Sequence, residues 1–481
     1  MSLSSSSDAA NTGSDSVTTQ ERRGFVRSIG LFPAIAINMT QMCGIGPFIT
    51  IPLMVAAIGG PQAIIGWIAG AILALADGLV WAELGAAMPG AGGTYLYLRE
   101  AFQYRTGKLM PFLFVWTAVL FIPMIMSTGV IGLVSYLGYL WPNMTTWETW
   151  LVSVAVVVIV IFALWRKVGD IGFLSTILWV IMLLSILAVT VASFTHFSPS
   201  LAFTYPNGAF TLNGQFFMGL GAGLVIGIYD YLGYNTTAYM AGEVRNPGRN
   251  IPLSIIVSIV LIMLFYLAMN VGVLGVEPWE VVAKSSSVAS LVLEKNWGPI
   301  AAQIVTVLIL ITAFASVFMG LLGGSRVPFN AARDGLFFRQ FARLHPRHQF
   351  PVVGVLVMGL LTAFFSFFSL AAVISMLTAV IVLVQAVAQI VALTVLRRRQ
   401  PGLRRPYRQW LYPIPSIIAL IGWIYVYYAS GWLPIILSLA WVVVGIVAFI
   451  IFAKVENIWP FAPIEVREEF LEASAESENI A

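Results

Sequence analysis

Long apolar runs dominate this chain and decide most of what it can fold into. About 18 or more consecutive apolar residues are needed for a helix to cross the hydrocarbon core of a bilayer. Of the 481 residues, 59% are hydrophobic and only 10% are charged, which lies outside the range of soluble globular domains. Barrel strands are shorter and alternate in pattern, so these runs predict an all-α polytopic membrane protein. Twelve transmembrane helices are predicted, with approximate limits 29–57, 62–88, 109–140, 148–166, 171–195, 215–242, 251–276, 298–323, 351–369, 371–396, 412–430 and 433–454.

The two ends of the chain differ from this apolar body. Residues 1–28 are rich in Ser and Thr and have no apolar stretch long enough for a cleavable signal, so they are predicted to form a disordered tail. Residues 29–454 form the predicted transmembrane domain. The segment 455–481 holds seven Glu against one Arg and is predicted to be a second solvated tail. No separate soluble domain is expected.

Basic residues are distributed very unevenly among the predicted loops. With twelve spans, 23 of the 25 Lys and Arg residues fall on one side of the membrane, and only Lys284 and Lys295 fall on the other. Since cytoplasmic loops carry the excess of Lys and Arg, both termini are predicted to be cytoplasmic, in a plasma (inner) membrane. The formal net charge of +4 then reflects topology, and a nucleic-acid partner is not expected.

The first apolar run is interrupted near its middle by Gly44, Ile45, Gly46 and Pro47. In a helix interior, each Gly costs about 1 kcal/mol and Pro about 3 kcal/mol relative to Ala. The helix is therefore expected to open at this point. Pro47 suits the start of the following half-helix, because its φ is already helical and its missing N–H would lack a partner there anyway.

The sixth run carries four glycines between residues 219 and 227, followed by Tyr229, Asp230, Tyr231, Leu232, Gly233, Tyr234 and Asn235. An ionisable group at this depth is costly unless it faces a cavity or a partner. A second opening is therefore predicted here, and both openings should line a polar pocket. The alternative is that the glycines only allow close helix packing, as expected for Gly66 and Gly70 in the second run.

Interruptions in the first and sixth spans are what two inverted repeats of five spans would produce. The repeats would cover about 29–195 and 215–396, and spans 11 and 12 would lie outside them. In such an architecture the substrate site lies at the interface of the repeats near the membrane midplane. The chain is thus expected to bind its substrate between the two breaks.

Four motifs, in order and in register, resemble those of the amino acid, polyamine and organocation permeases from about residue 24 to 454. They are GIGPF at 44–48, AELGAAMPGAGGTYLYLREAF at 82–102, AGEVRNPGRNIP at 241–252 and SRVPFNAARDGLFFRQFARLHPRHQFP at 325–351. One departure is Phe338, which stands where many members have Pro. The resemblance implies a LeuT-like fold and secondary active transport by alternating access, as proton symport or as exchange.

The resemblance also implies roles for the two breaks. Carried over to this chain, the backbone of Gly44, Ile45 and Gly46 would bind a substrate carboxylate. The segment Tyr229, Asp230 and Tyr231 would bind the substrate amino group. The first assignment agrees with physics, because the N-terminus of a half-helix offers unpaired N–H groups and a positive dipole end to an anion.

The substrate class is left between amino acids and polyamines. Pro47 removes one backbone donor from the anion-binding end, and Asp77 and Asp230 place two carboxylates within the membrane, so these features favour a cation. The acidic residue five positions before the AEL motif resembles plant-type polyamine uptake permeases. The segment around Gly233 resembles that of L-type amino acid exchangers instead.

Each intramembrane carboxylate has several readings. Asp77 and Asp230 are candidates for proton coupling, since burial raises the tendency of a carboxylate to hold a proton, and either could instead contact substrate or play a structural part. Glu83 and Glu243 lie near cytoplasmic span ends close to Arg residues, where gate or packing ion pairs are expected.

Other functional classes find little support in the sequence. A channel would need rings of polar or charged residues along a pore, and none is found in these spans. The three His and the single Cys43 do not assemble an enzyme centre or a metal site, so no enzymatic activity, metal or cofactor beyond a proton gradient is expected. A transport-silent sensor on the same scaffold remains an alternative.

Overall fold

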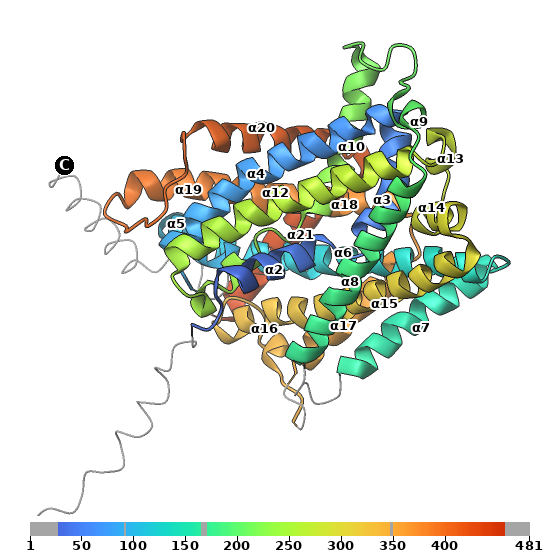
Figure 1. Cartoon of the computed structure of the whole chain (residues 1–481). Coiled ribbons are helices and arrows are strands. Elements are labelled where there is room, and N and C mark those ends of the chain that lie inside the picture. Colours follow the sequence, from blue (N-terminus) through green and yellow to red (C-terminus); the bar gives the residue numbers. More distant parts are fainter. Residues whose placement is uncertain (1–26, 91–92, 165–170, 347–349, 457–481) are drawn as a thin grey trace, which may run out of the picture.

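The computed structural model of the chain describes residues 27–90, 93–164, 171–346 and 350–456. Within these ranges the chain is a bundle of helices (Figure 1). The β-type pairing seen there consists of two isolated bridges, Ile29 with Val244 and Leu344 with Pro351. The predicted tails 1–28 and 455–481 lie almost wholly outside the described residues.

The first half of the chain supplies the two interrupted helices and the helices between them. Its helices are α2 (Leu31–Met42), α3 (Gly46–Ile58), α4 (Ile64–Ala87), α5 (Thr94–Thr106), α6 (Leu109–Leu140), α7 (Thr146–Leu164), α8 (Ile171–Thr195), α9 (Pro199–Phe203), α10 (Gly214–Tyr231) and α11 (Thr236–Tyr239).

The second half continues the bundle. Its helices are α12 (Pro247–Leu274), α13 (Trp279–Val282), α14 (Val288–Trp297), α15 (Pro299–Gly324), α16 (Arg326–Arg333), α17 (Val352–Phe365), α18 (Leu370–Ile381), α19 (Ala388–Arg399), α20 (Ile414–Ala429) and α21 (Trp432–Val455). A π-helical segment, Val382–Val387, joins α18 to α19.

Several of these helices are long enough to cross a membrane. Among the described residues, seven helices pass on length and apolar character, and the bent pair α2–α3 raises the number to eight. Shorter apolar helices lie at Trp179–Thr195, Val352–Phe365 and Ile414–Ala429, inside predicted spans 5, 9 and 11. The number of twelve spans and the inverted repeat therefore stay predictions.

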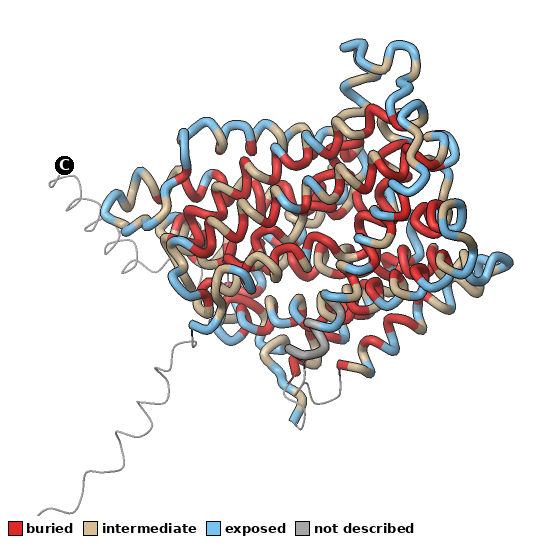
Figure 2. Tube along the Cα trace, viewed as in Figure 1, coloured by how far each residue is buried: buried red, intermediate tan, exposed pale blue. Residues whose placement is uncertain are grey.

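Apolar side chains also cover the outside of the bundle. Ile300, Leu360 and Trp432 are each at least 73% exposed, a state that is unfavourable in water and favourable against lipid tails. Buried residues concentrate along the central helices, whereas α20 keeps much of its surface exposed (Figure 2). Many residues of α21 are exposed as well. The chain is thus an integral membrane protein.

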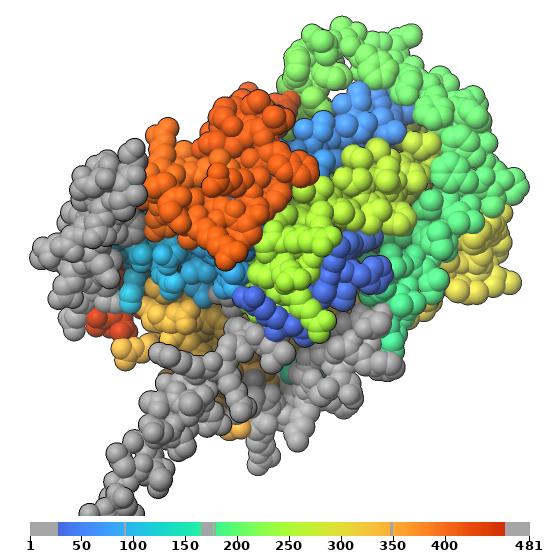
Figure 3. Space-filling model, turned by 60° about the vertical axis from the view of Figure 1, so that its left-hand side comes forward, coloured from blue at the N-terminus to red at the C-terminus, as the bar shows by residue number. Residues whose placement is uncertain are grey.

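Loops predicted to share one side of the membrane meet at one end of the bundle. Arg27, Arg249 and Arg404, from three of the predicted loops, line a single cavity. Lys108 Nζ donates to the Gly335 carbonyl at 3.1 Å, which joins two further loops of the predicted set. α19 packs against α5 at this end, where the segment of α19 and α20 (orange) lies against α5 (light blue) in Figure 3. The membrane face that this end occupies stays a prediction.

Candidate functional site

The first interruption separates α2 from α3. α2 ends at Met42, α3 begins at Gly46, and their axes differ by 51°. The break falls on the glycines and proline that the sequence singles out, because these residues give a continuous helix little stability. Pro47 lies in the first turn of α3, where its lack of an N–H costs no helical bond.

The second interruption lies just after α10. Leu232 takes an extended conformation and Gly233 has φ of +114°, after which the short helix α11 begins at Thr236. The predicted opening included Tyr229, Asp230 and Tyr231, but these residues form the last turn of α10. The break begins later than predicted because the backbone leaves the helix only where Gly233 allows a left-handed φ.

The two breaks are in direct contact. A Cβ added at Gly233 would lie 2.6 Å from the Gln41 Cβ and 3.1 Å from the Met42 nitrogen. Tyr266 of α12 donates its hydroxyl to the Met42 carbonyl at 2.8 Å and to the Asp230 carbonyl at 3.1 Å. The carbonyls that the two interruptions release thus share the single O–H proton of one side chain.

Hydrogen bonds join the halves of the interrupted helices in pairs. Asn38 of α2 donates to the Thr237 hydroxyl at 3.2 Å and accepts the Thr237 N–H at 3.0 Å. Thr50 of α3 donates to Asp230 Oδ2 and also to the Gly46 carbonyl. α2 is therefore bonded to α11, and α3 to α10.

Asp230 lies against the N-terminus of α3. A Cβ added at Gly46 would lie 2.3 Å from Asp230 Oδ1, so only glycine leaves room for the carboxylate there. Asp230 is 2% exposed, and its Oδ1 has no hydrogen-bond partner among the described residues. The structure therefore places a buried carboxylate oxygen without a donor beside the first turn of a half-helix.

The remaining predicted substrate residues divide into two groups. Tyr229 borders Gly46 with its ring, and its hydroxyl shares a hydrogen bond of 2.6 Å with the Thr128 hydroxyl of α6. Tyr231 points elsewhere, because its hydroxyl donates to the Trp67 carbonyl of α4 at 3.3 Å. Gly44 faces Ser316, and the Ile45 side chain packs over Gly132 of α6.

Asp77 belongs to the second break rather than the first. Its Oδ2 accepts the Tyr234 hydroxyl at 2.5 Å and the Trp81 Nε1–H at 3.1 Å, and the residue is 2% exposed. Tyr234 lies in the segment between α10 and α11, so Asp77 fixes that segment to α4. This is a structural contact, and it leaves the proposed proton role open.

Glu83 forms a buried ion pair at the basic end of the bundle. Its Oε1 accepts Arg397 Nε at 2.8 Å, its Oε2 accepts Arg397 Nη2 and the Gln409 N–H at 2.7 Å, and Arg405 Nε lies 3.5 Å away. Burial lowers the pKa of the Arg405 guanidinium, an effect that the Glu83 carboxylate opposes. The pairing expected from sequence is therefore observed for Glu83.

The ion pair expected for Glu243 is not observed among the described residues. Its backbone carbonyl accepts the Ile29 N–H at 3.0 Å. The neighbouring Arg245 instead donates its Nε to the Arg27 carbonyl at 3.1 Å, so it is bonded to the segment that precedes α2.

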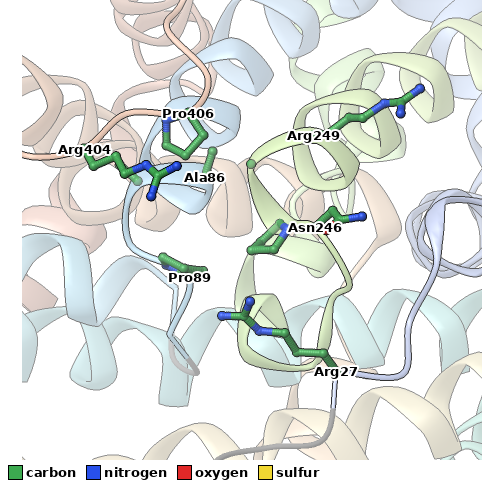
Figure 4. Close-up of a pocket in the computed structure, with 10 residues that line it drawn as sticks. Arg27, Ala86, Pro89, Asn246, Arg249, Arg404 and Pro406 are labelled. Atoms are coloured by element: carbon green, nitrogen blue, oxygen red, sulfur yellow. The ribbon is translucent and has the colours of Figure 1, made fainter.

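The cavity at the basic end is open and lies away from the breaks. It has a volume of about 520 Å³ and lies between the end of α4 and the start of α12. Arg27 and Arg404 reach toward its centre from opposite sides, whereas Arg249 points outward (Figure 4). Its arginines come from the loops with the predicted cytoplasmic excess of positive charge.

The site residues that were not identified from sequence include Thr50, Thr128 and Tyr266. Each is a buried polar residue inside an otherwise apolar run. Such a residue needs a hydrogen-bond partner, so its isolation in the run is the signal that could have drawn attention to it. Its position on the helix face toward the breaks follows only from the fold.

A polytopic helical membrane protein with a buried polar site between two helix breaks has the construction of a transporter. The chain belongs to the amino acid permease family, whose profile matches residues 29–464. The resemblance to the amino acid, polyamine and organocation permeases is thereby confirmed. The family and its relatives are transporters, not enzymes.

Three curated relatives cover most of the chain, and all come from Bacillus subtilis. The branched-chain amino acid permease BcaP is 23% identical over 91% of this chain and 95% of its own length. The aspartate-proton symporter is 25% identical over 89% of this chain and 84% of its own length. The serine/threonine exchanger SteT is 26% identical over 84% of this chain and 90% of its own length.

Proposed function

We propose that this protein is a secondary active transporter that moves amino acids across the plasma (inner) membrane by alternating access, driven by the proton gradient, with both termini in the cytoplasm. The observation that carries the proposal is the meeting of two helix breaks around a buried carboxylate. Irregular backbone at membrane depth is tolerated where it lines a cavity or is buried in protein, and such breaks form the sites of transporters.

The substrate poles follow from the helix ends. The N-terminus of α3 at Gly46, with Gly44 and Ile45 just before it, presents a positive dipole end that suits an α-carboxylate. The last turn of α10, with Tyr229, Asp230 and Tyr231, presents backbone carbonyl groups at a negative dipole end that suits an ammonium group. A zwitterion placed between them would meet a complementary group at each pole.

Two observations support amino acids and proton coupling. The full-length relatives are named for amino acids, and one of them is named an aspartate-proton symporter. Asp77 and Asp230 are the buried carboxylates near the breaks that could hold the proton. Exchange is the second candidate, because another relative is named a serine/threonine exchanger.

Uptake into proteoliposomes tests the proposal. Reconstituted protein would be offered neutral, acidic and cationic amino acids and the polyamines putrescine and spermidine as competitors, with and without an imposed pH gradient. Accumulation of an amino acid that depends on the gradient is expected. Flux only with amino acid on both sides would indicate exchange, preferential polyamine uptake would overturn the substrate class, and binding without any flux would indicate a sensor.

Tyr266→Phe is expected to slow uptake about tenfold and to lower the stability of the fold by about 1 to 3 kcal/mol. The Met42 and Asp230 carbonyls would lose the hydroxyl that satisfies them, and buried acceptors without donors cost energy of this order. Initial uptake rates and the thermal midpoint in detergent measure the two effects.

Tyr427→Phe is the matched control for that change. It removes a hydroxyl that shares a 2.9 Å hydrogen bond with Ser438 in the α20–α21 pair, away from both breaks. Uptake by this variant should match the wild type. Equal uptake by Tyr266→Phe would show that the bridge between the breaks is unimportant.

A further inference from the structure

The position of Asp230 creates a conflict with an amino acid substrate. Its carboxylate lies beside Gly46 at the N-terminus of α3, where the substrate carboxylate is expected to bind. Thr50, one turn further along α3, donates to Asp230 Oδ2 and fixes the carboxylate in this place. The protein's own side chain thus occupies the positive end of the half-helix.

Within the part of the chain that the structure describes, the groups around Asp230 do not supply a balancing cation. The titratable residues that interact with it electrostatically are Cys43, Tyr229, Tyr231 and Tyr266, a thiol and three phenols that are neutral near pH 7 at their ordinary pKa values. α3 and α18, which pack on this region, contain no Asp, Glu, Lys, Arg or His, and α20 contributes only tyrosines.

The acidic residues of α4 are engaged elsewhere. α4 contacts α10 through Gly70, which lies against Gly227 and Tyr231. Asp77 is two turns further along α4, about 10 Å away, and is bonded to Tyr234 and Trp81. Glu83 is paired with Arg397. Asp230 is therefore the acidic group that faces the anion-binding end of α3.

Two ionised carboxylates cannot share this end. At a separation of about 4 Å and an effective dielectric constant of about 20, their repulsion would weaken binding by about a thousandfold. A neutral Asp230 removes the repulsion, and its O–H can then donate a hydrogen bond to the substrate carboxylate. Oδ1, which lacks a partner among the described residues, is placed to take part in that bond.

We propose that the Asp230 carboxylate and the substrate α-carboxylate compete for the N-terminus of α3, so that an amino acid binds only when Asp230 carries a proton. The inference rests on the proposed function and supplies its coupling step. One proton from the water on the side of entry binds an Asp230 oxygen together with one substrate molecule. Both leave on the other side, and Asp230 returns to its ionised place against α3.

Binding measurements on purified full-length protein test this coupling. L-leucine, L-serine and L-arginine would be compared with their decarboxylated counterparts isopentylamine, ethanolamine and agmatine, from pH 5.5 to 8.5. The amino acid that binds should lose affinity by about tenfold per pH unit once Asp230 ionises in the free protein. Its binding in weakly buffered solution at high pH should take up about one proton per molecule.

Asp230→Asn separates this role from a merely structural one. The amide keeps an N–H donor and has no charge, so it resembles the protonated acid. Amino acid binding by the variant should be independent of pH, stronger than that of the wild type at pH 8.5, and free of proton uptake. Uptake into proteoliposomes should no longer respond to a pH gradient, while exchange of amino acid for amino acid continues.

Asp77→Asn tests the other buried carboxylate near the breaks, which lies away from α3. It should keep the pH dependence of binding and the proton uptake. The proposal would be overturned if Asp77→Asn, and not Asp230→Asn, lost the pH dependence of binding and the proton uptake. So would pH-independent amino acid binding by the wild type, a result that leaves the transport function intact.

The amines provide the remaining outcome. If the decarboxylated compounds bind more tightly than the amino acids and Asp230→Asn abolishes their binding at every pH, Asp230 is a direct ligand of a cationic substrate. In that case the proposed competition between the Asp230 and substrate carboxylates would be wrong, and so would the assignment of amino acids as substrates. The relative affinities of the wild type for amines and amino acids decide the substrate class even if the variant does not fold.

Discussion

Gly233→Ala is expected to reduce transport by about a hundredfold or more. The new methyl group would lie 2.6 Å from the Gln41 Cβ and 2.9 Å from the Gln41 carbonyl carbon, and backbone atoms cannot move aside cheaply. The residue also has φ of +114°, which alanine rarely adopts. Both effects separate the two breaks, and misplacing a binding group by about 1 Å can cost a hundredfold in activity.

Gly59→Ala is the control that separates the effect of the close contact at Gly233 from the effect of a positive φ. Gly59 also has a positive φ, of +82°, but a Cβ there would meet no atom within 4 Å. This variant should lose some stability and retain most of its uptake. Initial rates normalised to folded protein give the comparison, and similar losses in both variants would show that strain alone is responsible.

Glu83→Gln is expected to destabilise the fold by about 3 to 5 kcal/mol. Removing one partner of a buried pair leaves the other charge without compensation, and here Arg397 and Arg405 would both lose their carboxylate. The thermal midpoint in detergent should fall by several degrees. α4, α19 and the segment around Gln409 meet at this pair, so protection from proteolysis after Arg397–Arg399 should fall as well.

The matched control is Glu100→Gln. Glu100 pairs with Arg99 at 3.1 Å, but both side chains are more than a quarter exposed. Exposed pairs contribute about 0 to 1 kcal/mol, so the thermal midpoint should barely change. Equal shifts in the two variants would mean that the Glu83 pair is no more important than a surface contact.

The break in the first span could be predicted because its cause is local. Gly44, Gly46 and Pro47 weaken a helix wherever it packs, and the structure interrupts the span there. Close packing at Gly66 and Gly70 was also predictable, and Gly70 lies against Gly227 of α10. The loop charges likewise predicted which loops meet at one end.

The rotation of α10 could not be predicted in the same way. Gly223 and Gly227 let α10 approach Met54 of α3 closely, and this packing turns Asp230 toward Gly46 and Tyr231 toward α4. The sequence places all three residues of the segment Tyr229–Tyr231 at the same depth and therefore treats them as equivalent. Only the tertiary packing distinguishes a residue that faces the first break from one that faces away.

The crossed bonding of the interrupted helices has a mechanical consequence. α2 is bonded to α11 through Asn38 and Thr237, and α3 to α10 through Thr50 and Asp230. Each half of one helix is thus fastened to the opposite half of the other, with Tyr266 at the crossing. For the proposed alternating access, we therefore expect the breaks to act as one double hinge, about which the pair α2–α11 and the pair α3–α10 each move as a unit.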